Sequence, residues 1–315
     1  MADESPRAPW SLILAGGDGV RPRSLTHAIT GEARPKQFCP LLDGETLLEH
    51  TRRRVELLSR FDHQAIVVTR SHEAYYAPLV RDLAPGRLVE QPGNRGTGAG
   101  LLYALLRIAD LGGDVPVAVF PSDHFVDDDR TFVAAAAMAL DAVQARPDLV
   151  VLLGIEADTP ETEYGWIEAD DRPLAMDSAL VFPIRRFWEK PSAELAATLL
   201  ARRCLWNTFV MVGRVSAFLD LIAAGAPGLV ARFQPLRRAV GTSREADVAD
   251  AVYGTLPSIN FSEHVLVPCA ARLGTVRVKG VAWSDLGNVE RVYATIRRTG
   301  SRPRWLDNLP LPVAG

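Results

Sequence analysis

Cysteine is scarce in this sequence, which contains three cysteines in 315 residues. Cys39, Cys204 and Cys269 lie far apart, are odd in number and do not have the spacing of metal ligands. Disulfide frameworks and zinc sites need paired or closely spaced cysteines. The few cysteines therefore indicate a reduced environment, and we expect a cytoplasmic location.

Long hydrophobic runs and a strong excess of either charge are also absent. No apolar run reaches the roughly 20 residues that span a bilayer, so no membrane partner is expected. Residues 1–9 are acidic and contain proline, unlike a signal peptide, and we expect them to be flexible. The net charge of −3 creates no general basic field, so a nucleic-acid partner is not indicated either. Any site for an anion must be built locally.

The first half of the sequence does contain a regular alternation of strand and helix patterns. Continuous apolar runs predict strands at 10–15, 65–69, 115–120 and 149–153. Helical spacing predicts helices at 45–58, from 71 onward, at 97–109 and at 131–145. This alternation is typical of right-handed βαβ units. It predicts an α/β fold with a Rossmann-like, doubly wound, mainly parallel sheet.

The pattern changes after Tyr164. Residues 166–169 and 180–188 resemble strands separated by the turn-forming residues 170–173, which predicts an inserted hairpin. Further elements are expected as helices at 193–201, 215–224, 229–240 and 244–253, a strand at 274–278 and a closing helix at 289–297. No repeat or long linker interrupts the chain. We therefore expect a single domain over 10–300 and a C-terminal tail at 301–315.

A glycine-rich loop follows the first predicted strand. Residues 14–21 read Leu-Ala-Gly-Gly-Asp-Gly-Val-Arg, and residues 34–38 read Arg-Pro-Lys-Gln-Phe. Glycines let backbone N–H groups close on a phosphate, and Arg21 and Lys36 add two positive charges. The loop is not a Walker A motif and lacks the Gly-x-Gly-x-x-Gly order. Taken alone it is equally consistent with a tightly packed turn.

Polar residues also follow two other predicted strands. Ser122, Asp123 and His124 follow the strand at 115–120, and residues 90–98 end a strand and begin a helix with groups that suit a nucleobase edge. Ligands of open α/β sheets bind beyond the carboxyl ends of the strands. Asp123 could instead cap the next helix. The acidic residues 127–129 suit a solvated turn and an N-cap better than a metal site.

Taken together, these segments resemble the sugar-1-phosphate nucleotidyltransferase family, and within it the mannose-1-phosphate guanylyltransferases most closely. Besides the glycine-rich loop, five segments follow in the family's order: Ser122-Asp123-His124, Gly154-Ile155 with Glu161-Thr162-x-Tyr164-Gly165-Trp166-Ile167, Phe187-x-Glu189-Lys190-Pro191, Leu205-Trp206-Asn207-Thr208 and Trp283-Ser284-Asp285-Leu286-Gly287. The resemblance extends over residues 11–288. It implies a nucleotide half at about 10–150 and a sugar-binding half at about 151–290.

The reaction that the resemblance implies is an in-line attack by a sugar 1-phosphate oxygen on the α-phosphorus of a nucleoside triphosphate, which expels pyrophosphate. No protein nucleophile is needed, so positioning and charge neutralisation carry the catalysis. The implied catalytic residues are Arg21, Lys36, Asp123, Lys190 and Asp285. Asp123 and Asp285 would hold Mg²⁺, which takes few carboxylates and keeps phosphate oxygens and water as its other ligands.

The resemblance also assigns the two substrate sites. The nucleotide would be bound by Ala15, Gly16, Gly17, Gly19, Arg21, Lys36, Glu90, Asn94 and Thr97. The sugar phosphate would be bound by Gly165, Glu189, Lys190 and Asn207. The expected partners are thus two small molecules, GTP and mannose 1-phosphate, and a homodimer is left open.

Several positions depart from the family pattern. Val20 replaces a threonine before the arginine, and a longer run, 26–33, precedes Arg34. Phe209 stands where the family has glycine, and Asn260 where it has an acidic residue. The sequence ends about thirty residues after Asp285, so we expect neither a left-handed β-helix nor a cupin-like isomerase domain.

These departures keep other interpretations open. One is a different nucleoside-diphosphate-hexose pyrophosphorylase, because the residues on the sugar side depart more from the pattern than those on the phosphate side. The other is a catalytically silent protein that binds a nucleotide sugar and acts as a sensor or regulatory subunit. The identity of the sugar and the strictness for GTP stay open.

Overall fold

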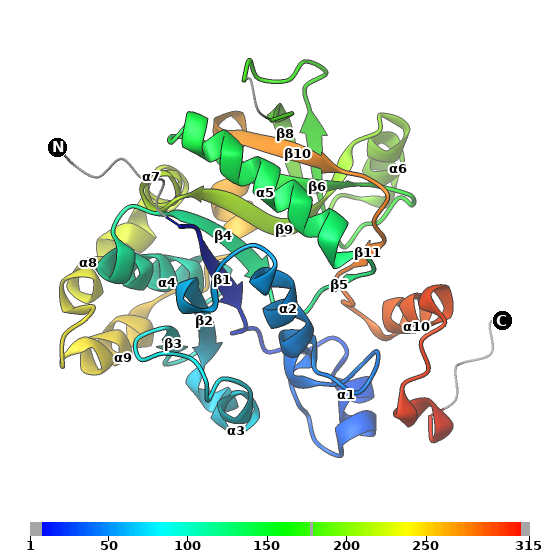
Figure 1. Cartoon of the computed structure of the whole chain (residues 1–315), viewed down its shortest axis with the longest axis horizontal. Helices are drawn as coiled ribbons and strands as arrows, with labels where there is room; N and C mark the ends of the chain where they lie inside the picture. Colours follow the sequence, from blue (N-terminus) through cyan, green and yellow to red (C-terminus); the bar gives the residue numbers. More distant parts are fainter. Residues whose placement is uncertain (1–7, 177–178, 310–315) are drawn as a thin grey trace.

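A nine-stranded sheet forms the centre of the fold (Figure 1). The computed structural model describes residues 8–176 and 179–309, so most of the N-terminus predicted to be flexible and residues 310–315 of the predicted tail lie outside the described residues. The strands, in their order across the sheet, are β3 (Leu88–Gln91), β2 (Gln64–Thr69), β1 (Trp10–Leu14), β4 (Pro116–Pro121), β9 (Leu205–Arg214), β6 (Val150–Glu156), β10 (Leu273–Val278), β8 (Phe182–Glu189) and β7 (Gly165–Ala169).

Most strands of this sheet point the same way. β3, β2, β1 and β4 pair in parallel, and so do β6 and β10. β9 runs antiparallel between β4 and β6, and β8 runs antiparallel to β10 and β7. The predicted fold class, α/β with a doubly wound and mainly parallel sheet, is therefore confirmed.

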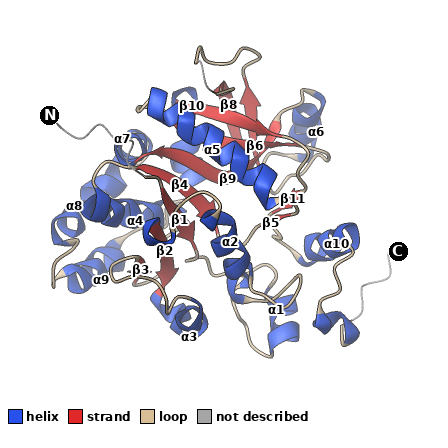
Figure 2. Cartoon of the chain, in the orientation of Figure 1, coloured by secondary structure: helices blue, strands red, loops and turns tan. Residues whose placement is uncertain are grey.

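Helices cover both faces of the sheet (Figure 2). The described helices are α1 (Arg23–Thr30), α2 (Leu47–Glu56), α3 (Glu73–Tyr76), α4 (Thr97–Gly112), α5 (Asp129–Ala145), α6 (Ala193–Ala201), α7 (Val215–Gly225), α8 (Pro227–Ala239), α9 (Glu245–Thr255) and α10 (Val289–Thr299). Leu12 packs with α4, α7 and α8 on one face, whereas the next residue, Ile13, packs with α2 and α5 on the other. A strand buried on both faces explains the continuous apolar run at the start of the sequence.

Local signals place the helix starts near the positions expected from the sequence. Thr46 and Glu49 form a capping box before α2, in which each side chain accepts a hydrogen bond from the other residue's backbone N–H. The Asp128 side chain caps α5, as the sequence predicted for the acidic run. Asp123 is therefore not needed as that helix's cap.

Two elements differ from the sequence expectation. Residues 26–33 were expected as part of a long loop, but α1 occupies most of this run and ends at Gly31, whose φ of 78° suits glycine. Leu25 on this helix is buried beside α10, which the local sequence does not reveal. β9 was not predicted as a strand because Asn207 and Thr208 interrupt its apolar pattern.

The predicted hairpin is part of the main sheet rather than a separate layer. β7 pairs with β8, and Trp166 and Ile167 also pair with Trp206 and Leu205 of β9. Part of the connection between the two strands, residues 177–178, lies outside the described residues. The hairpin thus extends the sheet on the side predicted to bind sugar.

A small ribbon connects distant parts of the chain next to the sheet. β5 (Phe125–Val126) pairs antiparallel with β11 (Trp283–Ser284), and the Asp127 carboxylate accepts a hydrogen bond of 2.7 Å from the Ala282 N–H. Beyond α10, Trp305 is buried and its indole N–H donates to the Leu41 carbonyl at 3.1 Å. The described part of the predicted C-terminal tail therefore packs on the body of the protein.

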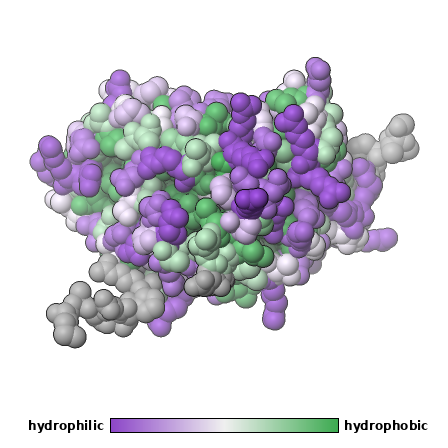
Figure 3. Space-filling view, turned by 90° about the horizontal axis from the view of Figure 1, so that it is seen from above, coloured by the Kyte–Doolittle hydropathy of each residue, from purple (hydrophilic) through white to green (hydrophobic). Residues whose placement is uncertain are grey.

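The surface carries mixed polarity. Hydrophilic and hydrophobic residues are interspersed on the face shown in Figure 3. Among the described residues, no helix is long and apolar enough to cross a membrane. One of the more exposed large apolar side chains is Val20, at the glycine-rich loop, with 63% of its surface accessible.

Candidate functional site

A cavity of about 480 Å³ opens along the carboxyl edge of the sheet. Its walls come from the glycine-rich loop after β1, the loop after β4, the ends of β7, β8 and β9, and residues 258–262. Parallel strands place the segments that follow them at one edge, which is why segments far apart in the sequence meet here.

The glycine-rich loop is held in place by hydrogen bonds to its carbonyl oxygens. The Gln37 side-chain amide donates to the carbonyls of Ala15 and Gly17 at 3.0 and 2.7 Å. Gly19 has a φ of 55°, and a Cβ atom there would lie 2.7 Å from the Lys36 backbone nitrogen. A Cβ atom on Gly16 would lie 2.4 Å from the Gln91 amide. Gly19 has to be glycine for the loop to close on the Lys36 backbone, whereas a side chain on Gly16 would displace the end of the Gln91 side chain.

Lys36 connects the two predicted metal ligands. Its side chain is almost fully buried, and its Nζ lies 3.1 Å from the Asp123 carboxylate and donates to the backbone carbonyl of Asp285. The β5–β11 ribbon brings Asp123 and Asp285 to this ammonium although they are 162 positions apart in the sequence (285 minus 123). The structure thus brings together three of the residues predicted to be catalytic.

Electrostatics around Asp123 favour its ionised form. Burial alone would raise the pKa of its carboxyl, but the charge of Lys36, with a smaller effect of His124, outweighs burial and holds the pKa below its ordinary value. His124 lies 3.5 Å from the same carboxylate, and burial lowers the pKa of its imidazole. Near neutral pH, Asp123 is a carboxylate beside a neutral imidazole.

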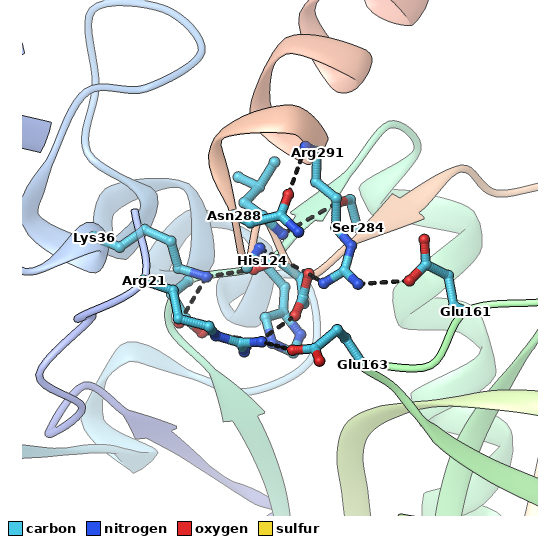
Figure 4. A network of polar contacts seen from close by, with 12 residues as sticks. Arg21, Lys36, His124, Glu161, Glu163, Ser284, Asn288 and Arg291 are labelled. Carbon is cyan, nitrogen blue, oxygen red and sulfur yellow. Dashed lines mark hydrogen bonds and ion pairs between the residues drawn. The ribbon is translucent and has the colours of Figure 1, made fainter. Parts of the chain in front are cut away.

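An alternating chain of charged side chains continues from Arg21, which lines the cavity, to Arg291 and Glu161 (Figure 4). Arg21 pairs with Glu163, and its other guanidinium nitrogen lies 3.9 Å from Asp285. Arg291 donates to Asp285 Oδ1 at 2.9 Å and to Glu161 at 2.6 Å. Each acidic group here lies between basic groups or beside one, so the charges of the cluster largely compensate one another.

Glu163 and Arg291 were not among the residues predicted from the sequence. Arg291 is 11% exposed, and its guanidinium carbon lies 4.4 Å from the centre of the Tyr164 ring. Glu163 occupies the unassigned position of the 161–167 segment, and Arg291 lies in the turn of α10 that follows the Asp285 segment. The sequence signal for these two residues is that each carries a charge in or next to a motif segment.

The residues predicted to bind sugar phosphate meet at one end of the cavity. A Cβ atom on Gly165 would lie 3.0 Å from a Glu189 carboxylate oxygen and 3.3 Å from the Asn207 Cβ. Lys190 lines the same region, and its φ of 47° is rare for a residue with a side chain. Burial raises the pKa of Glu189 above 4.5, against the opposing effects of Lys190 and Ser262.

At the nucleotide end, two of the three predicted base contacts line the cavity. Asn94 and Thr97 do so, and the Asn94 amide donates to Asp18 of the glycine-rich loop at 2.9 Å. Glu90 is not brought there: its carboxylate accepts a hydrogen bond from the Tyr76 hydroxyl, whereas Gln91 lines the cavity. Side chains alternate along β3, so neighbouring residues face opposite sides.

The carboxylates of Asp123 and Asp285 fit a magnesium ion shared with a phosphorylated ligand. Asp285 Oδ1 accepts hydrogen bonds from the Gly287 N–H and from Arg291, which leaves Oδ2 on the side of Arg21. Asp123 Oδ2 faces Lys36, and Oδ1 lies 3.5 Å from His124 Nε2. Mg²⁺ uses one or two carboxylate ligands and fills its other positions with phosphate oxygens and water. Two carboxylates that line one cavity match that preference.

Another acidic cluster among the described residues is less suited to a metal ion. Asp43, Glu45 and His50 lie close enough for three ligand atoms to meet. However, Arg53 pairs with Glu45 and contacts the ring of His50, while His50 contacts Asp43 at 2.9 Å. This cluster is a network of surface ion pairs at the start of α2.

The sheet order and the cavity at its carboxyl edge define the fold of nucleotide-diphospho-sugar transferases. The sequence model of the nucleotidyl transferase family matches residues 10–301, and the chain belongs to that family. Among solved structures, one from Thermus thermophilus, described as a mannose-1-phosphate geranyltransferase, superposes with a TM-score of 0.77. It is 31% identical, over 91% of this chain and 79% of its own.

Two named relatives show the same similarity. The xanthan biosynthesis protein XanB of Xanthomonas campestris is 30% identical over 285 residues, 88% of this chain and 57% of its own length. A putative mannose-1-phosphate guanylyltransferase of Vibrio cholerae is 27% identical over 88% of this chain and 58% of its own length. The chain thus spans little more than half the length of these relatives.

Proposed function

We propose that this protein transfers a nucleoside monophosphate, GMP from GTP, to mannose 1-phosphate and releases pyrophosphate. The observation that carries the proposal is the meeting of Lys36 with Asp123 and Asp285, two carboxylates that line the same cavity as Glu189, Lys190 and Asn207. Relatives named for mannose-1-phosphate guanylyl transfer support the choice of nucleotide and sugar.

Arg21 and Lys36 have the roles of phosphate clamps in this proposal. Lys36 is fixed by two oxygens, so its charge is preorganised for the α-phosphate as negative charge moves to the leaving pyrophosphate. Arg21 is bound to Glu163 and half exposed, so it can exchange that carboxylate for a phosphate oxygen. The attack needs no nucleophile from the protein, because the sugar phosphate oxygen itself forms the new bond to phosphorus.

Asp123 and Asp285 would hold the magnesium ion. Mg²⁺ held there would supply charge neutralisation and orientation. Arg291 and the Gly287 N–H hold one oxygen of Asp285, and Lys36 holds one oxygen of Asp123. These residues therefore fix the direction in which each carboxylate presents its remaining oxygen.

At the opposite end, Glu189 accepts hydrogen bonds from sugar hydroxyl groups and Lys190 pairs with the sugar phosphate. Gly165 keeps this end open, since a side chain there would meet Glu189 and Phe187. Asn94, Thr97 and Gln91 face the base end of the cavity. In this proposal the two phosphate groups lie between the base end and the sugar end, near Asp123 and Asp285.

A matrix of nucleoside triphosphates against sugar 1-phosphates, measured by pyrophosphate release with Mg²⁺, tests the proposal. We expect the highest kcat/KM for GTP with mannose 1-phosphate and at least about a hundredfold loss in D123N. A different preferred pair would revise the substrates but keep the reaction. No release with any pair, together with tight binding of GDP-mannose, would favour a catalytically silent sensor instead.

A further inference from the structure

Phe209 has an unusual backbone conformation at the sugar end of the cavity. Its φ is 60°, in the left-handed region that glycine adopts readily and side-chain-bearing residues adopt at a cost. Such strain persists where the surrounding structure demands it, and it concentrates at functional sites. Lys190, which lines the same cavity, also has a positive φ, as does Leu286, the neighbour of Asp285. The conformation of Phe209 therefore calls for an explanation in terms of the site.

Local hydrogen bonds fix the position of Phe209. Its backbone N–H donates to the Asn207 side-chain oxygen at 3.1 Å, and the Thr208 hydroxyl donates to the Leu153 carbonyl at 2.7 Å. The Phe209 ring packs edge-on against Phe261, with ring centres 6.1 Å apart. The ring is thus held in one position, and Phe209 is among the residues that line the cavity.

The polar side chains near Phe209 differ from it in the hydrogen-bonding groups that they offer to a ligand. The oxygen of the Asn207 amide is used by Phe209, so Asn207 offers its NH₂ group to a ligand. Glu189 offers a carboxylate. Phe209 offers neither donor nor acceptor. A sugar hydroxyl facing its ring would lose its hydrogen bonds to water without replacement.

We propose that Phe209 is a specificity-determining residue of the sugar subsite. The substrate is a sugar 1-phosphate that presents the C–H face of its ring to Phe209 while its hydroxyl groups face Glu189 and Asn207. This inference rests on the proposed function for the identity of the site. It restricts the substrates to sugar 1-phosphates without a hydroxyl group directed at Phe209.

The test compares mannose 1-phosphate with its singly deoxygenated and epimerised analogues in wild type, F209G and F209N. Asparagine tolerates a positive φ and adds hydrogen-bonding groups, while glycine removes the ring and its strain. For each sugar position we compare kcat/KM of the analogue that directs a hydroxyl group at residue 209 with kcat/KM of the analogue that does not. At one position, we expect F209N to raise this ratio at least about tenfold, because a buried hydroxyl group without a hydrogen-bond partner typically costs that much discrimination. F209G should weaken the wild-type discrimination at the same position.

F261L is the matched control, because Phe261 supports the ring but is fully buried behind it. It should lower the unfolding temperature and leave the ratios within about twofold. Equal ratios in wild type, F209G and F209N at every sugar position would overturn the inference.

Dissociation constants of the corresponding nucleotide sugars, measured by calorimetry, separate this inference from the proposed function. If the wild-type protein binds these products without turnover, the proposed reaction fails. A tenfold shift in the ratio of dissociation constants in F209N would then still support the role of Phe209, and unchanged ratios would overturn it.

Discussion

At the scale of single residues, Lys36 is the side chain on which the site depends most. It is buried and bound to both the Asp123 carboxylate and the Asp285 carbonyl. We expect K36M to lower kcat/KM at least about a hundredfold, the usual cost of removing a preorganised group that stabilises the transition state. K279M is the matched control, because Lys279 is exposed and pairs with Glu156 on the surface. A loss in K36M no larger than in K279M would contradict this role.

Glu189 provides a pH test of the sugar end. Burial raises its pKa above 4.5, so the neutral form is favoured by folding. That stabilisation is fully present below pH 4.5 and is lost as the pH rises through the raised pKa. We expect E189Q to be at least as stable as wild type at about pH 7, measured by thermal unfolding.

The same pKa predicts the activity profile. As the pH falls through the raised pKa, Glu189 takes up a proton and accepts fewer hydrogen bonds, so kcat/KM for the sugar phosphate should fall. E189Q should be slower and lack this acid limb. An unchanged acid limb in E189Q would assign it to another group.

Phe209 illustrates what a sequence reveals at this scale. The departure from glycine at this position was visible from the resemblance, but the positive φ and the contact with Phe261 were not. Glu90 was predicted to contact the base, but its neighbour Gln91 lines the cavity instead. The order of residues alone could not tell which of the two faces the cavity. That choice depends on the register of β3 in the sheet.

At the scale of elements, α10 is connected to the site through Arg291. Its guanidinium holds Asp285 and Glu161, and all three side chains are largely buried. Charge-assisted hydrogen bonds contribute about 1.5–3 kcal/mol each, so R291M should lower both the unfolding free energy and kcat/KM, the latter at least about tenfold. R297M, on the exposed side of the same helix, should change neither by a measurable amount. Equal effects of the two substitutions would show that Arg291 does not position Asp285.

Strand β9 is one of the elements that the sequence did not predict. Regular helices and buried strands were placed from their periodicity and caps, within a few residues. β9 was missed because the polar Asn207 and Thr208 interrupt its apolar pattern. Asn207 lines the cavity, and Thr208 donates to the Leu153 carbonyl where the register between β6 and β9 shifts. Helix α1 was missed because its buried Leu25 packs on α10, a contact between distant parts of the chain.

At the scale of the whole molecule, the fold class and most of the candidate site followed from motif order, because parallel strands place the loops after them at one edge. The pairing of β5 with β11 could not be predicted, since it joins two-residue strands 157 positions apart (283 minus 126). That ribbon is what brings Asp123 and Asp285 to one lysine. The ionic connections through Glu163 and Arg291 depend on the same convergence.

Ligands that bind across this cavity should stabilise the whole chain. GTP with Mg²⁺ at about 100 times the dissociation constant should add about 2.7 kcal/mol to the unfolding free energy by mass action. The part of this shift that requires Mg²⁺ should be lost in D123N and D285N, measured by thermal unfolding with and without a chelator. The same Mg²⁺-dependent shift in both variants would remove these carboxylates from the metal site.

The central claim is that the cavity joins a nucleoside triphosphate to a sugar 1-phosphate through the α-phosphorus. The most direct measurement follows α-labelled and γ-labelled GTP in a single turnover with mannose 1-phosphate and Mg²⁺. We predict that the α-label appears in a nucleotide sugar and the γ-label in pyrophosphate, in equal amounts, with neither product formed at a comparable rate by K36M. Retention of the α-label in GTP, or its appearance in GDP or GMP without a sugar product, would contradict the account.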